Sequence, residues 1–177
     1  PPSGSALSAG VYLEGCSIST FGGNVKILGN VASAGRAITT YGSISIDSKA
    51  GEIEIEGNAT NSAITNAYGV LFGIHDISIA SVVNLSSSAS GTAITIRGFS
   101  RGSEDAIGLS GTLNAQSTGT GGILFQGTPY GTGPGINIGN YYHGKLNAYA
   151  ASGDITFNGG SKGVYVSTAV TSGITTG

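Results

Sequence analysis

Branched apolar residues alternate with polar residues in two short runs of the segment 42–57. Ile44 and Ile46 are separated by a serine, and Ile53 and Ile55 are separated by a glutamate. Because successive side chains of a strand point to opposite faces, each run predicts a short strand with one apolar and one polar face. The small and polar residues between the two runs predict a turn.

Strands of this kind recur along the whole chain. A glycine followed by strand-forming residues occurs in the segments 10–15, 68–73, 91–98, 122–127 and 162–167. Second strands of the alternating kind lie between them, at residues 24–28, 44–46, 76–79, 111–115, 135–138 and 153–157. One such unit with its turns takes roughly 20 to 35 residues, which is the repeat length of solenoid proteins.

The short strands predict a solenoid. Strands of about three to five residues form no stable hairpin stack alone, whereas a coiled chain lets each turn stack on the last and bury one apolar column. We therefore expect an all-β fold with almost no helix, a right-handed parallel β-helix (β-solenoid) of roughly six to eight rungs. An antiparallel β-sandwich is the competing fold, because strand spacings of about 8 to 12 residues are common there too. Asn158-Gly159 is the only Asn-Gly or Asp-Gly hairpin signal in the sequence.

Composition supports a single domain rich in strands and turns. The 177 residues include 32 glycines, only 9% are charged, and Met and Trp are absent. We expect residues 1–9 to form a linker and residues 10–177 to form one β-solenoid domain. Because the chain lacks methionine and stops within the repeating pattern, we also expect it to be a fragment of a longer repeat array.

Charge and hydropathy argue against several partners. The formal net charge is -2, and the seven basic residues are scattered singly. This distribution provides no basic patch for nucleic acid or anionic lipid. No apolar run approaches the roughly 18 residues of a membrane helix, so we expect no direct membrane insertion.

Two local features refine the pattern. The single cysteine, Cys16, is in phase with Ile18, which predicts that its thiol points into the core as a small apolar group. Residues 127–135 carry two prolines among glycines, which predicts a surface loop at a corner of the coil.

Two stretches carry a family resemblance. Residues 10–29 read Gly-Val-Tyr-Leu-Glu-Gly-Cys-Ser-Ile-Ser-Thr-Phe-Gly-Gly-Asn-Val-Lys-Ile-Leu-Gly, and residues 153–159 read Gly-Asp-Ile-Thr-Phe-Asn-Gly. They resemble the β-strand repeats of filamentous-haemagglutinin-like exoproteins, the large bacterial adhesins exported by two-partner secretion. The resemblance covers most of the chain. It implies a secreted or outer-surface rod that mediates adhesion or aggregation or assembles into a fibre, and it implies no catalytic residues.

A row of carboxylates is the first candidate site. Glu52, Glu54 and Glu56 share the polar face of one predicted strand. With help from Asp47 they could hold a divalent cation, since Ca²⁺ prefers carboxylate oxygens. The alternative, which we favour, is a solvated strand face that deters pairing at a sheet edge.

Groups suited to catalysis are scarce. The two histidines, His75 and His143, lack a Ser/His/Asp signature around them, and we expect both at surface or turn positions. Glu104 and Asp105, near Arg101, form the best mixed cluster of charges. We therefore expect no enzyme, no catalytic residue, no metal site and no cofactor.

Aromatic side chains are the best candidates for ligand contact. Tyr130 lies in the proline-containing loop, and Tyr141, Tyr142 and His143 follow one strand later. Aromatic faces stack on sugar rings, and tyrosines suit wet interfaces. These four residues are therefore the candidate ligand contacts, and the alternative, which we favour, is packing at the corners of the turns.

These features predict a non-enzymatic adhesin or stalk segment, secreted or at the bacterial cell surface, that acts as an extended β-solenoid rod. One alternative is a subunit of a self-assembling extracellular structural filament that stacks rung on rung. The other is a carbohydrate-binding or carbohydrate-active β-helix. The expected partners are further copies, through open solenoid ends that expose strand edges, and host or environmental glycans or proteins.

Overall fold

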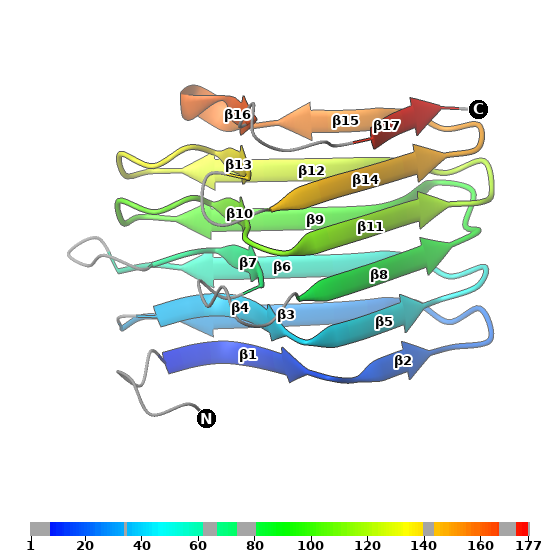
Figure 1. Ribbon diagram of the computed structural model, residues 1–177, viewed down its shortest axis with the longest axis horizontal. Coiled ribbons are helices and arrows are strands. Elements are labelled where there is room, and N and C mark those ends of the chain that lie inside the picture. The colour runs from blue at the N-terminus through cyan, green and yellow to red at the C-terminus, as the bar shows by residue number, and fades with distance from the viewer. Residues whose placement is uncertain are drawn as a thin grey trace.

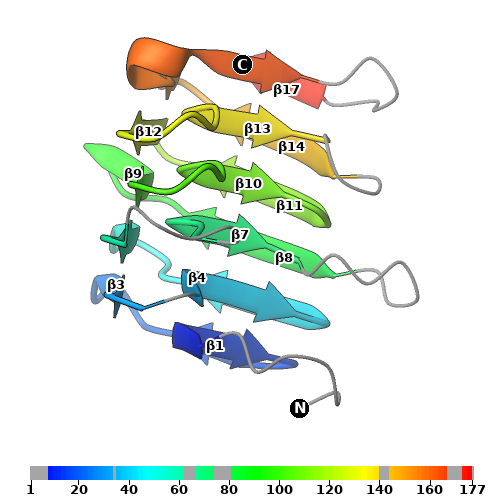
Figure 2. The ribbon, with the colours of Figure 1, turned by 90° about the vertical axis from the view of Figure 1, so that its left-hand side faces the viewer.

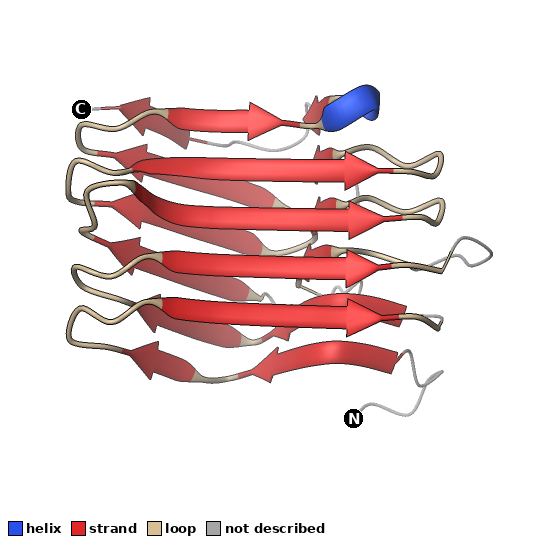
Figure 3. Cartoon of the chain, turned by 180° about the vertical axis from the view of Figure 1, so that it is seen from behind, coloured by secondary structure: helices blue, strands red, loops and turns tan. Residues whose placement is uncertain are grey.

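The protein is a β-solenoid built from parallel strands. The computed structural model describes residues 8–33, 35–61, 67–73, 81–139, 144–166 and 173–176. These residues wind into five complete right-handed turns and two strands of a sixth (Figure 1, Figure 3). The parallel β-helix predicted from the sequence is confirmed, and its number of turns falls just below the predicted six to eight rungs. All strand pairs among the described residues are parallel, which rules out the β-sandwich.

Each turn contributes one strand to each of three sheets, except that the sixth turn lacks a strand in the third. Sheet A consists of β1 (Ser8–Glu14), β4 (Gly35–Tyr41), β7 (Val70–Phe72), β10 (Ile107–Leu109), β13 (Ile136–Ile138) and β16 (Val164–Val166). Sheet B consists of β2 (Ser17–Ser19), β5 (Ser43–Asp47), β8 (Val82–Ser87), β11 (Thr112–Ser117), β14 (Lys145–Ala150) and β17 (Gly173–Thr176). Sheet C consists of β3 (Val25–Val31), β6 (Ile53–Ala59), β9 (Thr92–Ser100), β12 (Gly122–Pro129) and β15 (Ile155–Asn158). Figure 2 shows the strands of sheet A stacked from β1 at one end of the solenoid to β13 near the other.

Helical structure is limited to one short element in the described part of the chain. This element is the 3₁₀ turn η1 (Gly160–Lys162), which follows β15. No helix in the described ranges has the length and apolar character needed to cross a membrane.

A turn is larger than the repeat unit that the sequence pattern suggested, because it contains three strands and not two. Ile53 pairs with Val25 in the preceding turn, 28 residues earlier, and with Ile94 in the next turn, 41 residues later. The glycine-led segments 10–15 and 91–98 therefore belong to different sheets, A and C. The predicted strand at residues 76–79 lies outside the described residues.

The boundaries of two predicted segments differ in detail. Strand β1 begins at Ser8, within the segment expected to be a linker, and residues 1–7 lie outside the described part of the chain. Strand β12 continues to Pro129, so the predicted loop begins only after that residue. Proline is compatible with this position because β15 pairs with β12 only as far as Gln126, so Pro129 borders no strand on that side.

Aliphatic ladders fill the interior of the solenoid. In sheet C, Val25, Ile53, Ile94, Ile123 and Ile155 lie above one another in register. The three central isoleucines are almost completely buried, and burial of each such side chain stabilises the fold by about 1.5–3 kcal/mol. The alternation read from the sequence is thus confirmed, with the apolar face turned inward.

Two phenylalanines and a cysteine extend the aliphatic core toward the two ends of the solenoid. Phe125 of β12 and Phe157 of β15 stack with ring centroids 4.8 Å apart and an interplanar angle of 3°. Cys16, in the first turn, is partly buried against the core, as its phase with Ile18 predicted. The core therefore runs without a break through the described turns.

A column of glycines shapes the corner at which the chain leaves sheet C. Gly29, Gly57, Gly98 and Gly127 are in register and buried. A Cβ at Gly98 would lie 1.9 Å from the carbonyl oxygen of Ala106. The returning chain therefore lies directly against the strand at this column, and only glycine leaves room for it.

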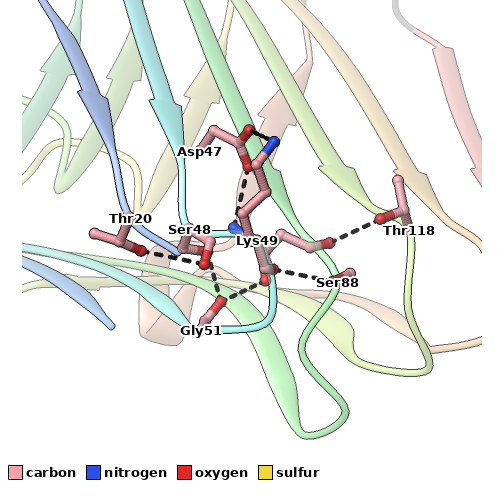
Figure 4. Close-up of polar contacts among 8 residues, drawn as sticks. Thr20, Asp47, Ser48, Lys49, Gly51, Ser88 and Thr118 are labelled. Carbon is pink, nitrogen blue, oxygen red and sulfur yellow. Dashed lines mark hydrogen bonds and ion pairs between the residues drawn. The ribbon is translucent and has the colours of Figure 1, made fainter. Parts of the chain in front are cut away.

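Hydroxyl side chains stabilise the corner between sheets B and C (Figure 4). Ser48 Oγ donates to the carbonyl oxygen of Gly51 at 2.5 Å, and Ser87 Oγ of the next turn donates to the same oxygen at 2.7 Å. Ser117, one turn further, is also buried and donates to the carbonyl oxygen of Gly121 at 2.6 Å. These bonds satisfy carbonyl groups that the turn removes from the strand ladder.

Candidate functional site

Charged side chains on the outer face of sheet C connect four turns. Lys26 Nζ lies 2.8 Å from Glu54 Oε2, and Arg97 Nη1 lies 2.8 Å from Glu54 Oε1. Arg97 Nε in turn donates to Gln126 Oε1 at 3.3 Å. The contacts cross β3, β6, β9 and β12 in order, and each ion pair at this solvated face contributes about 1 kcal/mol or less.

The carboxylates considered for a divalent cation are not brought together. Asp47 lies in sheet B, whereas Glu54 and Glu56 lie in sheet C, and Glu54 is paired with two cations. Lys49 donates from its side chain and its backbone N–H to Asp47, and these hydrogen bonds hold the pKa of Asp47 below its usual value. Within the described ranges, no three His, Cys, Asp or Glu side chains are grouped so that they could hold a metal ion.

A groove of about 310 Å³ lies next to this charged network on sheet C. Figure 3 shows the parallel strands of sheet C that form its floor. The groove is lined by two rows of outward-facing side chains and by the backbone between them: Glu56, Arg97 and Gln126 in one row, Asn58, Phe99 and Thr128 in the other, with Gly57 and Gly98 between. The two rows lie side by side because the strands pair in exact register across three turns.

An aromatic pair borders the groove. The rings of Phe99 and Tyr130 are tilted by 37° with centroids 4.6 Å apart. Tyr130 is 64% exposed, and the guanidinium carbon of Arg101 lies 6.0 Å from the centroid of its ring. Tyr130 is therefore accessible beside a groove. Its role as a ligand contact remains a prediction.

The other predicted aromatic contacts cannot be placed beside it. Tyr141, Tyr142 and His143 lie outside the described residues, as does His75. Phe99, Asn58 and Gln126 were not predicted as site residues from the sequence. The signal that could have found them is the glycine near the end of β6, β9 and β12, since aligning these strands on Gly57, Gly98 and Gly127 brings the flanking residues into columns.

The mixed charge cluster predicted at Arg101, Glu104 and Asp105 is separated in the structure. Arg101 is exposed and lies over Tyr130, whereas Asp105 is only 3% exposed. A Cβ at Gly108 of β10 would lie 3.2 Å from Asp105 Oδ2, so this carboxyl group covers the outer side of sheet A. The side chains of Arg101 and Asp105 therefore lie in different surroundings and do not act as one cluster.

Asp105 lies in a buried polar environment. Burial raises the pKa of its carboxyl group to about 7, the Asn137 side chain nearby lowers it, and the charge of Glu104 raises it. Asp105 Oδ2 and both polar atoms of the Asn137 side chain are buried without a hydrogen-bond partner. Burial therefore favours the protonated form of this carboxyl group.

A ladder of amides runs along the outer face of sheet B. Asn114 Nδ2 donates to Asn84 Oδ1 at 2.7 Å, and Asn147 Nδ2 donates to Asn114 Oδ1 at 2.7 Å. A second groove of about 260 Å³ lies over this ladder, where Gln116, Tyr149 and Thr175 are among the lining residues. Sheet B therefore also presents amides, hydroxyls and an aromatic ring to solvent.

Comparisons with protein-family models, with curated proteins and with solved structures find no match for the chain.

Proposed function

We propose that this protein is a non-enzymatic rod segment of a bacterial surface adhesin, secreted or held at the cell surface, that mediates adhesion or aggregation. The observation that carries the proposal is the division of the complete turns into an aliphatic interior and mostly polar outer faces of sheets B and C. The interior ladders give the rod stiffness, because each turn contributes to one continuous core. The outer faces repeat similar polar side chains along its length. The resemblance to filamentous-haemagglutinin-like exoproteins supports the same function.

The outer faces of sheets B and C fit a binding role. Both carry an open groove lined by amide, hydroxyl and aromatic side chains. The ion pairs of Glu54 and the amide ladder through Asn114 hold neighbouring turns in one register, so the side chains keep fixed spacings. Fixed, polar and wet surfaces suit recognition of external ligands.

Adhesion can be measured with beads coated with the protein. The coated beads are expected to bind mucin-coated surfaces, cultured epithelial cells or one another more than albumin-coated beads do. Beads coated with the chain that has been unfolded in urea and chemically prevented from refolding serve as the control for non-specific adhesion. The proposal is wrong if the folded protein gives no more attachment or aggregation than albumin on any of these surfaces.

A second candidate function is a filament subunit, and an apolar ladder that is continuous from the first to the last described turn favours it. In the last turn, Val164 and Ile174 are 40% and 54% exposed. Val164 ends a ladder through Ile136, and Val11 of the first turn starts the same ladder beneath Ile38. A second copy placed with its β1 over β16 would continue the ladder and cover both apolar edges.

Electron microscopy and sedimentation velocity test this stacking. Stacked copies should form fibres that become longer as the protein concentration rises. Each added turn should lengthen a fibre by about 4.8 Å. Replacing both Val164 and Ile174 by lysine should abolish the fibres, because it places charges at the edge. Leu28→Lys, which adds a charge on the outer face of sheet C, is the matched control and should leave them intact. A protein that stays monomeric at all concentrations contradicts the filament function.

A further inference from the structure

The strand register places polar side chains on both sides of Phe99 on the outer face of sheet C. Phe99 pairs with Asn58 in the preceding turn and with Thr128 in the next. Two residues earlier in the same strand, Arg97 pairs in the same way with Gln126. Side chains two residues apart lie on one face of a strand, so the two rows flank a single groove.

The aromatic pair gives this groove a face that can pack against a sugar ring. Phe99 and Tyr130 lie 4.6 Å apart, and Tyr130 is mostly exposed. An aromatic ring has a large apolar face, and tyrosine adds a polar hydroxyl group at its edge. This combination suits a ligand that has both C–H faces and hydroxyl groups.

Polar groups around the rings can satisfy the hydroxyl groups of such a ligand. Gln126 uses its Oε1 to accept from Arg97, and that bond does not involve the Gln126 NH₂ group. Asn58 lines the groove, and its Oδ1 is buried there without a hydrogen-bond partner. The Glu56 carboxylate adds further acceptors.

The charges of the groove favour a neutral ligand. The Arg97 guanidinium is paired with Glu54, and Arg101 lies over the Tyr130 ring. Glu56 supplies a negative charge within the groove. No concentration of positive charge remains there to select a sulfated or sialylated sugar.

We propose that the groove over β6, β9 and β12 binds a neutral glycan, with one sugar ring packed on Phe99 and Tyr130 and its hydroxyl groups bonded to Asn58, Glu56 and Gln126. This proposal rests on the adhesive function proposed above and names its ligand class. The groove volume of about 310 Å³ lies at the small end of ligand sites, so one or two sugar units fill it.

NMR titration of the labelled protein tests the site directly. The probes are the neutral disaccharides lactose, cellobiose and mannobiose, with sialyllactose as the charged comparison, each added to about 50 mM so that millimolar binding is detected. At least one neutral disaccharide should shift the side-chain amide signals of Asn58 and Gln126 and the backbone amide of Gly98. Sialyllactose should shift them less.

Matched variants assign the binding to the aromatic pair. Tyr130→Ala and Phe99→Ala should each raise the Kd for that disaccharide at least about tenfold, as expected for loss of an aromatic anchor. Tyr12→Ala removes an exposed tyrosine of β1 in sheet A, outside both grooves, and should leave the Kd unchanged. Tyr130 is exposed, so its variant remains informative even if Phe99→Ala fails to fold.

The outcomes separate this site from the adhesive function. Absence of shifts with every neutral disaccharide, shifts confined to another face, or stronger binding of sialyllactose would each overturn the proposed site. Bead adhesion that persists in Tyr130→Ala would overturn the groove as the adhesive contact while leaving the adhesin function in place. Disaccharide binding by a protein whose beads adhere to nothing supports the groove and refutes the adhesive function.

Discussion

Replacement of Asp105 by asparagine should remove a pH dependence of stability that originates in one buried carboxyl group. Burial raises the pKa of Asp105 from 3.8 to about 7, and the charge of Glu104 adds to this rise. Between about pH 4 and pH 7, the folded protein therefore holds a proton that the unfolded chain releases. The free energy of unfolding must then fall as pH rises through this window and must become independent of this group above it.

The magnitude follows from the size of the shift. One pKa unit corresponds to about 1.4 kcal/mol, so a rise from 3.8 to about 7 corresponds to a loss on the order of 4 kcal/mol between pH 4 and pH 8. The slope should reach about 1.4 kcal/mol per pH unit near pH 5 to 6, where one proton distinguishes the two states. This is a large part of the stability of a typical domain, about 5–15 kcal/mol.

Urea unfolding at about pH 5, 6, 7 and 8 measures the effect. Asp105→Asn keeps the shape of the side chain and cannot ionise, so its unfolding free energy should lack the decline of the parent and should exceed it most at pH 8. Asp154→Asn, at an exposed position, should retain the slope of the parent. Parallel pH profiles of the parent and of Asp105→Asn would refute the assignment of the proton to Asp105.

Three further substitutions test the packing of the solenoid, and urea unfolding measures each. Gly98→Ala should cost about 3 kcal/mol or prevent folding, because its Cβ would lie 1.9 Å from a carbonyl oxygen. Gly23→Ala should change stability little, because its Cβ would lie 3.9 Å from Thr20 Cβ, an ordinary van der Waals contact; equal effects would contradict the glycine column. Phe125→Ala should cost about 3–5 kcal/mol, since the ring is buried and stacked, and a cost below about 1 kcal/mol would contradict that packing. Asn114→Ala should cost about 1–2 kcal/mol by breaking both bonds of the amide ladder, and an unchanged unfolding free energy would show that the ladder adds no stability.

The candidate site was predictable only in part. Tyr130 could be chosen from the sequence because an aromatic residue in a loop between glycines and prolines is seldom a core residue. Phe99 could not be assigned to the same site, because a phenylalanine inside a strand reads equally well as core. Its outward direction depends on Gly98, which occupies the inward position at the corner.

The contacts of the charged side chains could not be predicted from the local sequence pattern either. Glu54 contacts Lys26 and Arg97, which come from the turns below and above, and Arg97 lies 43 residues away in the chain. Asp105 and Arg101 are close in sequence, yet one is buried over sheet A and the other covers an exposed ring. Their separation follows from the path of the loop, which no local spacing describes.

The sequence by itself determined the strands and their faces, because alternation of isoleucine with serine or glutamate can bury only one side of a strand. It also favoured parallel stacking over a β-sandwich, since such short strands gain a core when a coil places them above one another, and the strand pairing in the structure decided between the two folds. The tertiary structure alone decided which residues became neighbours. Turns of unequal length set the register, so Ile53 meets Ile94 and Asn58 meets Phe99. Side chains far apart in the chain form a groove only after the backbone hydrogen bonds between turns have fixed that register.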